Sequence, residues 1–340
     1  MTDQTMLGAL GPDAVGELVS RREAIERGVK VSAFTHAALA LGSVPVALGA
    51  LAGIAQAQPA TSTIVDVLQF ALLLENFEAE FYKAVLGTSS VGAFNTAFAT
   101  VRTAASANAA ALGTLTLLRD HEIAHVAALQ ATIRNLGGTP AIYDPAATFD
   151  FGGNRNATLL ATDPFYPATQ DLGFLLALTQ TVEDTGVRAY KGQAAKLLGT
   201  TTLTTALQIH SLEARHAARI RRIRRTLGVA TDTTNVRAAG LVKGGTATTA
   251  AGYTGAASTT VPAASITALT NTANLVYAGE GNTSHTASTG AIDASTLPGL
   301  LTGTDVTQAF DEPLTAQQVV AIVQPFVIPN ITLGPSLANG

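Results

Sequence analysis

The stretch LLLENFEAEFY, residues 72–82, decides the fold, because its spacing of acidic and aromatic residues returns later in the chain. Within it, Glu75 is followed seven positions on by Tyr82, and Glu183 is followed at the same distance by Tyr190. Residues seven apart on a helix lie two turns apart on nearly the same face. The repeat therefore predicts two equivalent helices, each with one acidic and one phenolic side chain on one face.

Each Glu/Tyr pair precedes a Glu-x-x-His motif. The first motif is Glu122 to His125 and the second is Glu213 to His216. Residues three apart are neighbours on a helix, so each motif can bind one ion from one helix. One Glu or one Glu-x-x-His on each of four helices is the ligand set of a two-metal carboxylate site in a four-helix bundle. The candidate metal ligands are Glu75, Glu122, His125, Glu183, Glu213 and His216.

Two interpretations of these residues stay open. In the first, the carboxylates bind metal, because burying them without metal or protons is very costly. In the second, the bundle has kept its fold and lost its metal, with the carboxylates paired to Arg or His. Tyr82 and Tyr190 are candidate catalytic residues that hydrogen-bond ligands or pass electrons, or they are core tyrosines tied to a neighbour.

Further polar residues lie near the motifs. Glu78 is one turn from Glu75 and is an alternative ligand, whereas Glu80 and Asp184 are expected to be solvated. His210 lies three positions before Glu213, and either orients a ligand or lies on the surface.

His121 points about 100° away from Glu122 on a helix, so we do not expect it to bind the metal.

Four helices are expected over residues 62–86, 101–136, 170–198 and 204–227, with Ser62 or Thr63 as the first N-cap and a glycine after each helix. Residues 137–169, which contain four prolines, form a long connection between the second and third helices. A long link between two helix pairs is what the ferritin-like crossover version of the bundle needs. We therefore predict an all-α core over residues 61–228.

The composition of the chain limits the classes of protein to which it can belong. The chain has 340 residues, is 47% hydrophobic and 13% charged, and carries a formal net charge of −4. This length permits a large core, and the charge gives no reason to expect a nucleic-acid partner. There are no cysteines, which excludes disulfides and thiolate metal ligands.

Residues 1–60 are predicted to be an export signal or an amino-terminal helical anchor. Arg21-Arg22 precedes a stretch without Lys, Arg, Asp or Glu over residues 31–65, and Ala55-Gln56-Ala57 is a small-x-small site. This order is typical of an export signal, and the paired arginines resemble a twin-arginine signal. The alternatives are an uncleaved anchor, with membrane contact through residues 31–57, and a buried helix pair in a chain that is never exported. Export would place the protein in the periplasm or on the cell surface.

Residues 229–340 differ in composition from the bundle. They are rich in Thr, Ala and Gly, and we expect loops, short strands and one short helix that pack on the bundle or on a neighbouring subunit. The runs at 258–262 and 265–269 are expected to be strands or extended loops, with a flexible linker as the alternative. Thr315 and Gln318 form a capping box that should begin the short helix.

The motifs together resemble the di-iron ferritin-like superfamily. FALLLENFEAEFY, RDHEIAHVAAL, FDF at 149–151 and VEDTGVRAYKG look like the ferritin-like domain family that includes plant desiccation-related proteins and many exported bacterial proteins. AFDEPLT at 309–315, followed by VVAIVQPFV, is similar to that family's carboxy-terminal motif. The resemblance covers residues 64–227, and residues 276–327 in patches. It implies that the six candidate ligands hold two iron ions, which react with dioxygen or peroxide.

Two functions are consistent with these observations. The first is a metal-binding protein of ferroxidase-like or peroxide-consuming activity, with two iron ions or two manganese ions, that protects against oxidative or desiccation stress. Manganese is an alternative because carboxylate-rich sites suit it. The second is a structural, exported subunit of a surface or filamentous assembly with little or no catalysis. In both cases we expect a homo-oligomer.

Overall fold

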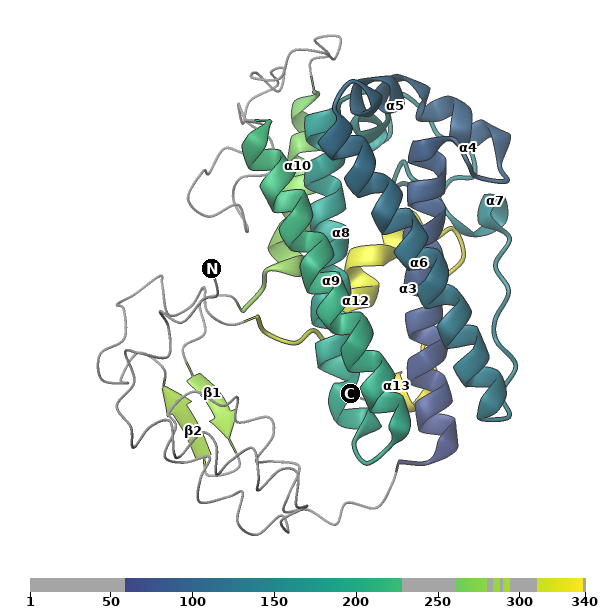
Figure 1. The fold of residues 1–340 in the computed structure, drawn as a ribbon, viewed down its shortest axis with the longest axis vertical. Helices are drawn as coiled ribbons and strands as arrows, with labels where there is room; N and C mark the ends of the chain where they lie inside the picture. The colour runs from purple at the N-terminus through teal and green to yellow at the C-terminus, as the bar shows by residue number, and fades with distance from the viewer. Residues whose placement is uncertain (1–58, 228–260, 280–283, 288–289, 294–310, 339–340) are drawn as a thin grey trace, which may run out of the picture. The chain divides into compact units, whose positions relative to one another are not determined.

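The computed structural model describes residues 59–227, 261–279, 284–287, 290–293 and 311–338 (Figure 1). The chain divides into two units, residues 1–55 with 283–299 and residues 56–282 with 300–340. In the smaller unit the described residues form an antiparallel hairpin of β1 (Ser284–Ala287) and β2 (Gly290–Asp293). The predicted export signal or anchor lies outside the described residues. Among the helices that the structure describes, none combines the length and the apolar character that a membrane span requires.

The larger unit is built on four long helices, which are α3 (Thr61–Leu86), α6 (Ala109–Asn135), α8 (Leu172–Gln193) and α9 (Thr201–Thr226). Helix α3 packs along α6, and α8 packs along α9 (Figure 1). The apolar faces of the two pairs meet in one continuous core. This arrangement confirms the predicted four-helix bundle.

The helix ends follow the sequence only in part. Helix α3 ends at Gly87, whose φ of 76° is left-handed as expected, but its N-cap is Ala60, without a side-chain cap, and not Ser62 or Thr63. The helix predicted over 101–136 is two helices, α5 (Ala99–Ser106) and α6, and a third short helix, α4 (Gly92–Ala97), precedes them. Asn108 separates α5 from α6, because its side chain accepts a hydrogen bond from the Ala111 N–H and begins a new helix. Helix α8 ends at Gln193 and is followed by the 3₁₀ helix η6 (Ala194–Leu197).

The predicted long crossover between α6 and α8 is confirmed. It contains α7 (Pro145–Thr148) and the 3₁₀ helix η5 (Tyr166–Thr169). The buried carboxylate of Asp150 accepts hydrogen bonds from the backbone N–H groups of Gly152, Asn154 and Asn156. These bonds hold the loop around one side chain, which explains why a connection of this length keeps a defined path.

The carboxy-terminal extension is more helical than predicted. It contains α10 (Ala263–Val276), α12 (Ala316–Val323), the 3₁₀ helix η8 (Gln324–Phe326) and α13 (Pro335–Ala338). Helices α10 and α12 pack on α8, and α13 packs on α3. The capping box of Thr315 and Gln318 is present, whereas the extended structure expected over residues 265–269 is wrong because they lie in α10.

Arg188 of α8 joins the extension to the bundle. Its buried guanidinium donates hydrogen bonds to the backbone carbonyls of Val276, Ala278 and Glu312. A Cβ atom at Gly192, one turn further along α8, would lie 1.8 Å from the carbonyl oxygen of Leu314. The extension therefore lies directly against the backbone of α8.

Candidate metal centre

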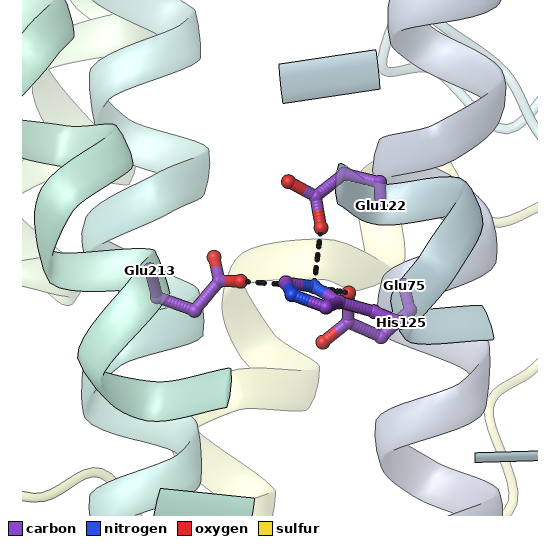
Figure 2. Close-up of side chains that lie close together, drawn as sticks. All are labelled: Glu75, Glu122, His125 and Glu213. Carbon is purple, nitrogen blue, oxygen red and sulfur yellow. Dashed lines mark hydrogen bonds and ion pairs between the residues drawn. The ribbon is translucent and has the colours of Figure 1, made fainter. Parts of the chain in front are cut away.

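The six candidate ligands meet in the middle of the bundle, although they come from four helices. Each side chain is buried, with exposed fractions between 0% and 6%. Figure 2 shows Glu75 of α3, Glu122 and His125 of α6 and Glu213 of α9 turned toward one another. A second group consists of Glu122, Glu183, Glu213 and His216. The two groups share Glu122 and Glu213, which is the arrangement of two neighbouring metal positions with two bridging carboxylates.

Each imidazole is surrounded by carboxylate oxygens. Nδ1 of His125 lies 2.8 Å from Glu122, 3.0 Å from Glu75 and 3.3 Å from Glu213. Nδ1 of His216 lies 2.9 Å from Glu122 and 3.1 Å from Glu183. One Nδ1 carries at most one hydrogen, so it cannot donate to all of these oxygens at once.

The carboxylates also have unused acceptor capacity. In the part of the chain that the structure describes, Oε2 of the fully buried Glu213 has no hydrogen-bond partner. Burying an ionised carboxylate without a partner is costly, and a bound cation removes that cost. The donor set, four carboxylates and two imidazoles without sulfur, suits iron and manganese. These residues therefore fit two transition-metal ions.

The electrostatics show a competition between protons and metal. Burial raises the pKa values of Glu122 and Glu213 well above their usual range, and neighbouring carboxylates raise them further. Burial also acts to raise the pKa of Glu75, but the hydrogen bond and charge of His125 outweigh it and lower that pKa. Burial acts to lower the pKa of His216, but the charge of Glu183 and the hydrogen bonds that the imidazole donates to Glu122 and Glu183 raise it to about 9. Without a cation, the cluster therefore holds protons that a metal ion would displace.

The two tyrosines contact ligands of the opposite helix pair. The Tyr82 hydroxyl of α3 donates to Oε1 of Glu183 on α8. The Tyr190 hydroxyl of α8 donates to Oε1 of Glu75 on α3, with an O–O distance of 2.5 Å. Burial raises the pKa of both phenols well above 10, so both remain neutral donors. Each tyrosine thus fixes the orientation of one terminal carboxylate.

Histidine positions differ from the sequence-based expectation. His210, a candidate for orienting a ligand, contacts the carbonyl of Val187 through Nδ1 at 2.9 Å and no candidate ligand that the described residues provide. His121 instead contacts the site, because its Nδ1 lies 2.9 Å from Nε2 of His216. Helical periodicity places His121 away from Glu122 on α6, but it gives no information about the facing helix α9, where His216 lies.

Three further acidic residues are also buried. Glu78 is 4% exposed, and burial followed by the charges of Glu75 and Glu183 raises its pKa well above its usual range. The expectation that Glu80 and Asp184 are solvated is wrong. Glu80 accepts hydrogen bonds from Ser89 and Lys83, and Asp184 contacts Arg221 and the Tyr277 hydroxyl. The partners of Asp184 are distant in sequence, and Tyr277 is 93 residues away, so local patterns do not reveal them.

A bundle with one Glu or one Glu-x-x-His turned inward from each helix is the arrangement found in ferritin-like carboxylate proteins. Comparison with protein families agrees with this class. Residues 63–226, the four-helix bundle, match the family described as "Ferritin-like domain". No curated protein and no solved structure matches the chain.

Proposed function

We propose that the bundle binds two iron ions and that the bound ions react with dioxygen or peroxide. The observation that carries this proposal is the overlap of two ligand groups at Glu122 and Glu213, with an unpartnered Oε2 on Glu213. Manganese suits the same oxygen and imidazole donors and is the alternative metal. When bound, two ferrous ions supply the two electrons that, with two protons, reduce dioxygen to hydrogen peroxide or hydrogen peroxide to two waters.

The residues have separate roles in this proposal. Glu75 and His125 would hold one ion, Glu183 and His216 would hold the other, and the two shared glutamates would bridge them. Tyr82 and Tyr190 keep the terminal carboxylates in position through their hydroxyl groups. Apolar side chains around the cluster exclude bulk water, which strengthens each electrostatic interaction inside it.

Metal content tests this proposal directly. The full chain is purified without an affinity metal, loaded with Fe(II) or Mn(II) and measured by mass spectrometry beside the double variant Glu122→Ala/Glu213→Ala. We expect about two ions per chain in the wild type and almost none in the double variant. Asp120→Ala is the matched control, because Asp120 is an exposed acid on the same helix as Glu122.

The reaction is measured separately. Wild-type protein loaded anaerobically with Fe(II) is mixed with dioxygen or with hydrogen peroxide, and iron oxidation is followed by absorbance. We expect faster oxidation than by free Fe(II) under the same conditions and no acceleration in the double variant. A wild-type protein that binds neither metal, or bound iron that both oxidants leave ferrous, would contradict the proposal.

A further inference from the structure

A small cavity lies beside the candidate metal centre. It has a volume of about 20 Å³ and lies between α3, α8 and the helices of the carboxy-terminal extension. Phe77 and Leu178 form part of its wall on the bundle side, and Ile322 and Phe326 close it on the side of α12 and η8. Figure 2 shows α12, in pale yellow, behind the ligand cluster.

The cavity reaches the ligands at Gly186. Gly186 lines the cavity, and a Cβ atom at this position would lie 2.9 Å from Oε2 of Glu213, the carboxylate oxygen without a partner. Glycine in the middle of a helix costs about 0.5–1 kcal/mol relative to alanine. Gly186 therefore destabilises α8 slightly, but it leaves space beside the Glu213 carboxylate that a Cβ atom would fill. Glu78, whose pKa is raised by burial and by the charges of Glu75 and Glu183, lines the same cavity. The cavity therefore borders the metal centre directly.

The lining of the cavity does not suit polar molecules. Three threonines contribute to it, but each hydroxyl already donates to a carbonyl of its own helix: Thr181 to Ala177, Thr185 to Thr181 and Thr272 to Ala268. A buried water requires two to four polar partners. Among the described residues of the lining, Glu78 is the only ionisable side chain. Apart from Glu78, the lining therefore offers few hydrogen-bond partners to water or hydrogen peroxide.

The size of the cavity fits one small molecule. Its volume exceeds the roughly 10–15 Å³ that a molecule of the size of water needs, measured in the same way. Apolar cavities stay dry and bind apolar guests. We propose that this cavity receives dioxygen in preference to peroxide and delivers it to the metal centre past Gly186. The proposal rests on the proposed function and specifies the oxidant.

Xenon tests the cavity without any reaction. Xenon is an apolar atom that occupies dry apolar cavities. We expect crystals of the metal-free full chain under xenon pressure to bind xenon between Phe77 and Ile322. Thr272→Leu fills the cavity from α10, and the exposed Thr270→Leu is the matched control on the same helix. Xenon should be lost in Thr272→Leu and retained in Thr270→Leu, and Ile322→Phe is a second filling variant if Thr272→Leu does not fold.

The oxidant is tested on the same variants after Fe(II) loading. We expect the filling variant to bind wild-type amounts of iron. Its reaction with dioxygen should be slower than that of the wild type by a factor of about five or more, whereas its reaction with hydrogen peroxide should keep the wild-type rate. Absence of xenon in the wild type overturns the cavity as a binding site. An unchanged dioxygen rate, or an equal loss with both oxidants, overturns the assignment of dioxygen. If the wild type binds no metal, both the proposed function and the delivery of dioxygen are overturned. The xenon experiment needs no metal, so it decides separately whether the cavity binds an apolar molecule.

Discussion

The helix pair α3/α6 and the helix pair α8/α9 contribute matching ligands but have different surroundings. When Glu75 is aligned with Glu183, Tyr82 aligns with Tyr190. In the same alignment, however, Glu78 aligns with Gly186, and Glu80 aligns with Arg188. The matching Glu and Tyr positions belong to the ligand cluster and its tyrosine contacts, whereas Gly186 faces the cavity and Arg188 contacts the carboxy-terminal extension.

This difference shows that two separate requirements, metal coordination and packing against the covering helices, determine the residues of a helix pair. A two-metal site fixes the acid and imidazole positions of both pairs, since every ligand is needed for coordination. The other positions depend on what covers each pair, and both α10 and α12 pack on α8. The buried Arg188 contacts this cover, and the mid-helix Gly186 lines the cavity beneath it.

The largest expected effect concerns Arg188 and its equivalent, Glu80. Arg188→Met should lower the free energy of unfolding by about 3–5 kcal/mol, because three hydrogen bonds from a buried charged donor to the carbonyls of Val276, Ala278 and Glu312 are lost. Glu80→Gln should cost only about 1 kcal/mol, because an amide oxygen still accepts from Ser89. Urea unfolding of both variants measures the two values. Equal losses would show that the two helix pairs are covered alike.

The next effect concerns pH and the ligands themselves. The pKa of His216 is raised to about 9 in the folded metal-free protein, against about 6.5 in the unfolded chain. Its stabilisation is therefore fully present below pH 6.5 and is lost as the pH rises through 9, a decline of about 3 kcal/mol. The raised pKa values of Glu122 and Glu213 act in the same direction. Urea unfolding between pH 6 and 9.5 should show this decline, and His216→Gln should reduce it. A flat profile in the wild type would contradict the charge arrangement described above.

The smallest expected effect tests the equivalence of the tyrosines. Tyr82→Phe and Tyr190→Phe should each weaken metal binding by about tenfold, because each removes one hydrogen bond that orients a ligand. Chelator competition measures the change, and Tyr143→Phe, outside the metal centre, is the control. Effects that differ strongly between the two variants would show that the two metal positions are not held equally.

The sequence predicts the bundle and the ligand cluster well because both depend on short-range spacing. Seven-residue and three-residue intervals place Glu75, Tyr82 and the Glu-x-x-His motifs on helix faces, and helix ends such as Gly87 carry local backbone signals. The residues that match the ferritin-like domain family, 63–226, contain these motifs.

The sequence predicts less where partners come from distant segments. Helix α10 contains several threonines, which disfavour helix slightly, but burial of Leu269, Ala273 and Val276 outweighs this propensity. The contact of His121 with His216 and the contact of Asp184 with Tyr277 both depend on the packing of separate helices. Local periodicity contains no information about such pairs.

The crossed tyrosine contacts also have a consequence for the order of folding. They join residues that are 101 and 115 positions apart, so they cannot form before α3 has docked on α8. Contacts of such long range are slow to form because a long loop must close first. Either helix pair alone would lack the hydroxyl that positions its own terminal glutamate. Metal capture during refolding should therefore follow the collapse of each helix pair and report the moment at which the two pairs assemble.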